Sequence, residues 1–271
     1  MKARIKFQKY GAMKFVGHLD VMRYFQKMFR RAEIDNEYTK GFSPHQIMSF
    51  AAPLGVGLTS DAEYVDIQLR SSEEPKEMID RMNVAMTEGF RVIGFHPLLE
   101  REENKKSVTA MSLVCSADYL VSLKDGYRIS DTITGQAEFA KAFQAFMDQK
   151  EIITDKKTKT SEKAIDIKPM ITLNAFSSRE YNEKLTTFMA PQLPESVKGE
   201  SVADCYQNGI MVYLQVDTGS AANLKPETVM EAFSDFMGVP YEKFAWQVHR
   251  LEVYTRIGED KKLAALDQVE R

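Results

Sequence analysis

The chain has 271 residues, 44% of them hydrophobic, and a formal net charge of −3. This composition is typical of a globular protein with a sizeable core, and it excludes a disordered chain and a uniformly cationic nucleic-acid coat. The two cysteines, Cys115 and Cys205, have no metal or redox spacing, which argues against a disulfide framework, a zinc ribbon or a cysteine-ligated cluster. No apolar leader follows Met1 and no long apolar run occurs, so we expect a soluble, cytoplasmic protein without a membrane partner.

The first hundred residues predict the order βαββαβ. Alternation over residues 2–9 predicts a half-buried strand whose cationic face, with Lys2, Arg4 and Lys6, projects from the uncovered side of a sheet. Helical spacing over 18–33 predicts an amphipathic helix that turns Leu19, Met22, Phe25 and Phe29 inward. Strands over 47–53 and 63–70, a helix over 75–87 and a strand over 90–98 follow. This order is that of a ferredoxin-like fold.

The pattern recurs in the second half of the chain. We predict strands over 108–124, 209–217 and 248–256, helices over 136–148 and 226–237, and a Lys-rich hairpin within 151–174, whereas 177–205 are irregular. The fold class is therefore α+β, with two tandem ferredoxin-like (βαββαβ) units whose antiparallel sheets carry helices on one face. The predicted boundaries are 1–100, 105–258 and a charged C-terminal tail over 259–271.

Charge is distributed unevenly along the chain. Residues 1–31 hold nine Lys or Arg and one acid, a net charge of +8, which leaves −11 for the remainder. Such asymmetry predicts a local positive field that attracts a phosphate-bearing partner, although a merely solvated basic face gives the same pattern.

Two glycine-marked turns in the same region display histidines. Gly17-His18 enters the first predicted helix, where free N–H groups and the helix dipole favour an anion. The Gly41-Phe42-Ser43-Pro44-His45 turn is rigid by composition and displays His45. We predict that His18, Asp20, Arg23, Tyr38 and His45 share one anion-binding pocket. Capping and a local ion pair to Arg23 also account for Asp20.

Several chemistries lack their signatures. The chain has no GxxxxGK[ST] loop, no GxGxxG, no HExxH and no CxxxCxxC, so it is not expected to hydrolyse nucleotides, bind a dinucleotide or hold an iron–sulfur cluster. His18, Asp20 and His45 match no known metal-ligand spacing, and we predict neither a metal nor a cofactor.

Three segments, KFVGHLDVMRYFQKMFRRA, EYTKGFSPHQIMSFAAPLGVG and SDAEYVDIQL, resemble the N-terminal signature of the radical-SAM-linked protein family of unknown function. That family commonly has HLDLMR and GFNPHP where this chain has HLDVMR and GFSPHQ. The chain is similar to the stand-alone form of a domain that is also found fused to cobalamin-binding radical-SAM proteins, often beside ribosome-related genes. The resemblance implies an accessory role with a radical-SAM enzyme as partner. The predicted architecture also resembles CRISPR RAMP-type RNA-binding proteins.

These observations leave three hypotheses open. The first is a non-catalytic RNA-binding or substrate-presenting accessory protein that acts with a radical-SAM enzyme in RNA or ribosome-related modification. The second is a metal-independent endoribonuclease in which His18 or His45 moves protons. The third is a protein-docking module without RNA binding. The candidate anion or RNA-binding residues are Lys2, Arg4, Lys6, His18, Asp20, Arg23, Lys27, Arg30, Arg31, Tyr38, Lys40, His45, Lys156, Lys157 and Lys159.

Overall fold

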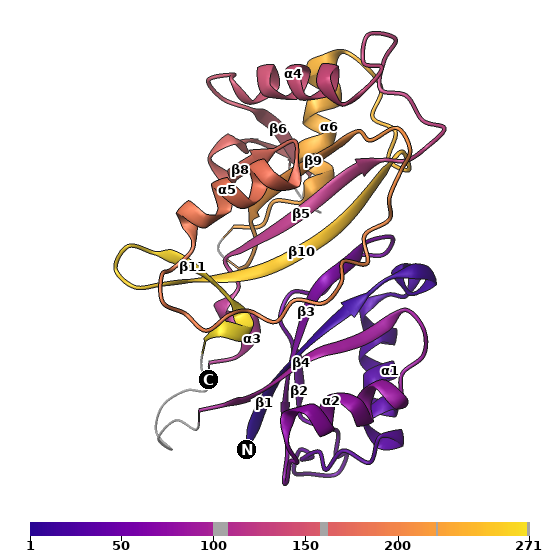
Figure 1. Cartoon of the computed structure of the whole chain (residues 1–271), viewed down its shortest axis with the longest axis vertical. Coiled ribbons are helices and arrows are strands. Elements are labelled where there is room, and N and C mark those ends of the chain that lie inside the picture. Colours follow the sequence, from indigo (N-terminus) through magenta and orange to yellow (C-terminus); the bar gives the residue numbers. More distant parts are fainter. Residues whose placement is uncertain (100–107, 158–161, 221, 270–271) are drawn as a thin grey trace. The chain divides into compact units, whose positions relative to one another are not determined.

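The computed structural model describes residues 1–99, 108–157, 162–220 and 222–269, with only the backbone at 155–157 and 162–163 (Figure 1). It is a mixed α/β protein with mostly antiparallel sheet pairing. The chain divides into two compact units. Unit 1 comprises Met1–Cys115, Met189–Ala203 and Arg250–Arg271, and unit 2 comprises Ser116–Phe188 and Asp204–His249. None of the helices in the described ranges is long and apolar enough to cross a membrane.

Unit 1 is built on the strand order β4-β1-β3, and the short β2 pairs with β3. Its elements are β1 (Lys2–Lys9), the 3-10 helix η1 (Gly11–Phe15), α1 (His18–Arg31), β2 (Met48–Phe50), β3 (Thr59–Gln68), α2 (Pro75–Val84), β4 (Phe90–Leu98), α3 (Ala110–Leu113), β11 (Lys262–Ala265) and the 3-10 helix η3 (Leu266–Gln268). Strand β10 (Trp246–Ile257) begins in unit 2, and from Arg250 onward it belongs to unit 1, where it pairs with β11.

The alternation of β1 places its side chains on two very different faces. Ala3, Ile5 and Phe7 pack into the core with the inner sides of α1 and α2. Phe7 and Phe25 are at the centre of this core, with ring centroids 4.6 Å apart. Arg4 and Lys6, which point to the other face, are also buried. Both faces of β1 are therefore covered.

The inward face of α1 differs from the prediction by a rotation. The helix begins at His18, as expected, but Leu19 is 62% exposed and Met22 is only half-buried. Its buried side chains are Val21, Phe25, Met28 and Phe29. This set follows the i, i+4, i+7 spacing of one helix face, so Val21 occupies the position that the prediction gave to Leu19.

The second face of the unit 1 sheet is covered by segments far away in sequence. Residues 189–203, called the strap below, contain no helix or strand and contact β11, where the Ala190 N–H donates to the Leu263 carbonyl at 2.8 Å. The strap also reaches β1, since the Gln8 side chain donates to the Glu200 carbonyl at 2.7 Å. The predicted charged tail over 259–271 is instead a strand and a 3-10 helix with a buried run over 263–267, because these residues complete the covered face.

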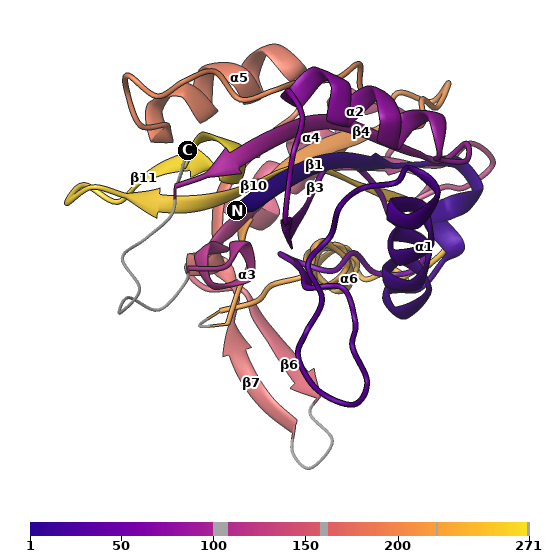
Figure 2. The same cartoon turned by 90° about the horizontal axis from the view of Figure 1, so that it is seen from below.

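Unit 2 has the strand order β5-β9-β8, and β10 is next to β5 on the side away from β9. Its elements are β5 (Ser116–Leu123), α4 (Gln136–Met147), β6 (Ile153–Lys157), β7 (Glu162–Asp166), the 3-10 helix η2 (Lys168–Met170), β8 (Ile171–Ala175), α5 (Ser178–Phe188), β9 (Met211–Asp217) and α6 (Pro226–Met237). Strands β6 and β7 pair only with each other as a hairpin, which Figure 2 shows as a two-stranded ribbon.

The core of unit 2 is aromatic. Phe139 and Phe143 of α4 lie against Phe233 of α6, with ring centroids 5.6 and 5.1 Å apart. Helix α5 was not predicted, because its only buried side chain is Tyr181, which stacks on Tyr213 at 4.9 Å. A helix with one buried residue carries no apolar stripe in its sequence.

The assignment of both units to the ferredoxin-like fold stays a prediction. The unit boundaries differ from the predicted ones, because the strap and residues 250–271 group with the N-terminal part of the chain. Contacts between residues this distant in sequence leave no local composition shift.

Candidate nucleic-acid interface

The cationic face predicted for β1 is not available to a partner. Arg4 and Lys6 are 0% and 1% exposed. Arg4 donates to both carboxylate oxygens of Asp66, at 2.7 and 3.1 Å, and to the carbonyl of Leu266 at 2.7 Å. Lys2 is half-buried. The expectation that Arg4 and Lys6 project toward phosphate is thus corrected: both are interior cations, neutralised by carboxylates of their own unit.

Lys6 is at the centre of a buried polar network. Its ammonium donates to Glu252 at 2.6 Å and to the Ser196 hydroxyl at 2.8 Å, and it lies 3.6 Å from Asp267. The Tyr64 hydroxyl donates to Glu252 at 2.6 Å. Burial, followed by the charges of Glu252 and Asp267, raises the pKa of Tyr64 well above its ordinary value of 10.0. The Tyr64 hydroxyl therefore stays protonated and links β10, which carries Glu252, to η3, which carries Asp267.

The strap supplies part of this network. Ser196 donates to Asp267 at 2.8 Å, and the Val197 N–H donates to the other oxygen of the same carboxylate at 2.8 Å. Gly199 lies so close to β1 that a Cβ there would be 3.1 Å from the Gln8 side-chain nitrogen. Hydrogen bonds to a charged group are the stronger kind, so the strap is fixed where it crosses the sheet.

A second buried charge pair, which the sequence did not indicate, lies at the end of β1. Arg250 donates through Nε to Glu63 at 2.9 Å, and the two residues also form a closer contact through the Arg250 Nη2 atom. The Lys9 ammonium donates to the Val16 carbonyl at 2.9 Å. Burial lowers the pKa of Lys9, Glu63 opposes that effect, and Arg250 adds to it. Lys9 is therefore also an interior cation, and it contacts the backbone just before α1 begins.

At the start of α1, His18 is a partly buried packing residue. Its ring lies edge-on to Phe50, with centroids 5.3 Å apart. Gly17 is the N-cap and provides no side-chain cap. Asp20 accepts from Arg23 at 3.1 Å, and both side chains are about two-thirds exposed, at 66% and 67%. An exposed pair of this kind contributes little to stability.

His45 lies far from His18. It is exposed, near the end of a hairpin that follows α1, and the Thr39 N–H donates to its carbonyl at 2.9 Å. Phe50, which packs against His18, pairs with Val65. From Phe50 back to His45 the chain runs toward the C-terminal end of β3. Five extended residues span about 16 Å. The structure does not bring the two histidines together, so the predicted shared pocket with Tyr38 is not formed.

The cations of α1 separate into two groups. Arg31 donates to the carbonyl of Ala85, the C-cap residue of α2, at 2.9 and 3.3 Å and lies over the Tyr24 ring at 5.8 Å. It therefore joins two elements of unit 1. Arg23, Lys27 and Arg30 are exposed. Their i, i+4, i+7 spacing places these three side chains along one outer stripe of α1, about 10 Å long.

This stripe, Arg23–Lys27–Arg30, is the candidate interface. Arg30 bonds only the Gln26 carbonyl of its own helix turn, at 3.3 Å, and Arg23 bonds only the exposed Asp20 carboxylate among the contacts of the described residues. Lys40 is likewise exposed, on the hairpin that carries His45. Planar guanidinium groups bind phosphate through paired N–H donors. The stripe thus offers the charge and the donors for a phosphate backbone.

The Lys-rich hairpin cannot be placed in the same detail. Lys156 and Lys157 belong to β6, of which only the backbone is described at these positions, and Lys159 lies outside the described residues. Within the described ranges, no group of three or more His, Cys, Asp or Glu residues is arranged to hold a metal ion.

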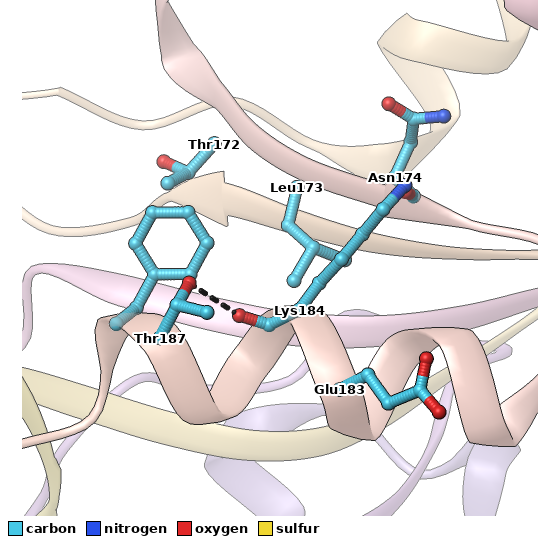
Figure 3. Close-up of a pocket in the computed structure, with 7 residues that line it drawn as sticks. Thr172, Leu173, Asn174, Glu183, Lys184 and Thr187 are labelled. Atoms are coloured by element: carbon cyan, nitrogen blue, oxygen red, sulfur yellow. Dashed lines mark hydrogen bonds between the residues drawn. The ribbon is translucent and has the colours of Figure 1, made fainter.

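Unit 2 contains a cavity of about 420 Å³ between β8 and α5 (Figure 3). It is lined by Thr172, Leu173, Asn174, Glu183, Lys184, Thr187 and Phe188. The Lys184 ammonium is bound to Glu180 at 2.7 Å and to the Asn174 carbonyl at 2.8 Å. The Lys184 charge is consequently paired within unit 2.

No curated protein matches this chain. Among solved structures, a similar chain occurs in the crystal structure of a Cbf5-Nop10-Gar1 complex, with 9% sequence identity and a TM-score of 0.42. That match covers 93% of this chain and 48% of the other, so this chain spans about half the length of the structure it matches. The family described as "Uncharacterized protein conserved in bacteria (DUF2344)" matches residues 2–226, and the chain therefore belongs to that family.

Proposed function

We propose that the chain is a non-catalytic accessory protein that binds RNA through the outer face of α1. The observation that carries this proposal is the exposed stripe of Arg23, Lys27 and Arg30, because these cations remain at the surface while Arg4 and Lys6 are neutralised inside. A row of exposed cations on a rigid helix suits a phosphate backbone, and such contacts give salt-dependent affinity without sequence readout.

The accessory role is favoured over a ribonuclease because the acid–base groups are dispersed. Acid–base cleavage needs proton donors and acceptors within hydrogen-bond reach of one substrate atom. His18 packs against Phe50, whereas His45 lies on a separate hairpin. The resemblance to radical-SAM-linked proteins extends the proposal: RNA held on α1 would be presented to a separate radical-SAM enzyme.

Binding of total tRNA at two salt concentrations tests the RNA proposal. We expect binding at low salt that weakens steeply at higher salt, and a Lys27→Glu, Arg30→Glu variant that loses it. The matched control is Lys141→Glu, Lys150→Glu, which reverses two exposed cations of unit 2 and is expected to bind as the unchanged protein does. Absence of binding at low salt, or an equal loss in both variants, would contradict an α1 interface.

A further inference from the structure

We propose that unit 1 binds unpaired RNA rather than duplex, with the exposed rings of Phe15 and Phe42 as stacking platforms for bases. This inference rests on the proposed function, since the α1 stripe supplies the phosphate contacts. Both rings belong to unit 1. Lys14 directly precedes Phe15, and Lys40 is two residues before Phe42. Aromatic side chains next to cations are the recurring composition of surfaces that bind single strands.

Phe15 forms part of an apolar patch at the start of α1. Its side chain is 67% exposed, and Leu19 and Val56 are 62% and 61% exposed. The loop that carries Val56 is held against this turn, because the Gly57 N–H donates to the Lys14 carbonyl at 2.7 Å. A Cβ on Gly17 would lie 3.9 Å from the Val56 methyl group. The three apolar side chains thus gather around one fixed turn, and clustered exposure of this kind marks an interaction surface more often than single exposed residues do.

The charges around this patch favour a nucleic acid. The Lys14 ammonium lies 5.7 Å from the centroid of the Phe15 ring, and Arg23 follows Leu19 by one helical turn. Asp20 is the only acid in the first turn of α1 and is paired with Arg23. A base that stacks on Phe15 would place its phosphates near these cations. A neutral apolar protein could cover the ring but would gain no attraction from the Lys14 ammonium beside it.

Phe42 provides a second platform on a separate, well-braced hairpin. The ring is fully exposed. The hairpin is closed below it by the bridge between Tyr38 and Gln46 and by the His45 N–H, which donates to the Thr39 hydroxyl at 3.1 Å. Because the hairpin backbone is fixed, stacking of an RNA base on Phe42 has to order only the phenylalanine side chain, which limits the entropy lost on binding.

Stacking on exposed rings selects unpaired RNA. In a duplex each base is already stacked on its neighbours, and the deep groove of A-form RNA excludes side chains. Unpaired bases expose their faces, and stacking tolerates any sequence because every base has such a face. Duplex RNA would contact the Arg23–Lys27–Arg30 stripe alone, and unpaired RNA would contact the stripe and the rings.

The test compares a short oligouridylate with a blunt RNA duplex of the same length, by fluorescence anisotropy at low salt. We expect Phe15→Ala and Phe42→Ala each to weaken oligouridylate binding by about fivefold to 150-fold, the range for one lost stack. Duplex binding is expected to stay within about twofold, since the phosphate contacts are unchanged. Phe244→Ala, which removes a 73% exposed ring of unit 2, is the matched control and is expected to change neither affinity.

Each outcome separates this inference from the proposed function. If both phenylalanine variants bind oligouridylate normally while Lys27→Glu, Arg30→Glu loses all RNA, the stacking inference is overturned and the RNA interface stands. If the phenylalanine variants weaken duplex and oligouridylate equally, selection for unpaired RNA is overturned. If the unchanged protein binds neither RNA, the proposed function falls as well, and the patch is then a surface for an acidic protein. Phe15→Tyr, which keeps a ring, is expected to retain binding. Phe15 and Phe42 are surface residues, so circular dichroism of the variants should match that of the unchanged protein.

Discussion

Two groups of cations in unit 1 come from neighbouring stretches of sequence and have different roles. Strand β1 supplies Arg4 and Lys6, and helix α1 supplies Lys27 and Arg30. The β1 cations are buried with carboxylates from β3, β10 and η3, whereas the α1 cations face solvent. A positive segment in a sequence therefore contains both cations that stabilise a fold and cations that are free to bind, and only burial separates them.

The largest expected loss of stability follows the substitution of a buried cation of β1. Lys6→Ala leaves Glu252 and Asp267 in the interior without their shared cation, and removal of one partner of a buried pair typically costs about 3–5 kcal/mol. Urea denaturation measures this loss. Lys27→Ala, the matched change on α1, is expected to shift the free energy of unfolding by no more than about 0.5 kcal/mol. Equal, small losses in the two variants would mean that the buried network does not stabilise the unit.

The same network predicts a loss of stability at alkaline pH. Because the pKa of Tyr64 is raised, the folded protein keeps the phenolic proton after the unfolded chain has released it. The contribution is fully present below the ordinary pKa of 10.0 and is lost as the pH rises above it. Denaturation midpoints at several pH values from 9 to about 11 should therefore fall less steeply for Tyr64→Phe than for the unchanged protein.

Lys9 is expected to change stability with pH in the direction opposite to that of Tyr64. Its pKa is lowered by burial, so the folded protein releases the ammonium proton before the unfolded chain does. Stability from this group rises as the pH approaches 10.5, the ordinary value. Lys9 is present in both proteins of the comparison, so the difference between Tyr64→Phe and the unchanged protein isolates the tyrosine. An identical alkaline slope in the two would contradict the raised pKa.

A smaller effect is expected to separate two adjacent arginines. Arg31 bonds the carbonyl at the C-cap of α2. Because Arg31 is exposed, Arg31→Ala should cost about 1 kcal/mol, the value for a typical net hydrogen bond. Arg30 bonds only its own helix, and Arg30→Ala should leave stability within about 0.5 kcal/mol. Thermal unfolding of both variants measures the difference. For RNA affinity we expect the opposite order: Arg30→Ala should weaken RNA binding more than Arg31→Ala does.

The sequence predicted those parts of the fold that rest on local periodicity. The bounds of β4 and α6 are confirmed, and α1 begins at His18 as expected. The C-terminal strand β11 and the helix α5 were missed, since α5 buries only Tyr181 and β11 depends on a partner strand for its identity. Local pattern indicates an element only where the element has an apolar face of its own.

The candidate site was only partly predictable, for a related reason. The sequence indicated a cationic segment, and the exposed Arg23, Lys27 and Arg30 belong to it. It could not indicate that Lys6 meets Glu252, because that partner lies 246 positions away. The strap, which contacts β1 from the other side, has no helical or strand pattern. Burial of the β1 cations is a non-local property, and it decides which charges remain available.

The smallest change in stability accompanies the most direct test of the exposed stripe. Lys27→Ala and Arg30→Ala should each leave the free energy of unfolding within about 0.5 kcal/mol, since neither side chain bonds a distant element in the described structure. Each should nevertheless reduce the slope of the logarithm of RNA affinity against the logarithm of salt concentration by about 0.7, the value for one phosphate contact to a single strand. Lys141→Ala on α4 is the control and should leave the slope unchanged. Titrations of oligouridylate at several salt concentrations measure the slope. A slope that falls equally in all three variants would mean that RNA responds to the overall charge of the protein, and a slope that falls only for the α1 variants would identify the stripe as the place where phosphates bind.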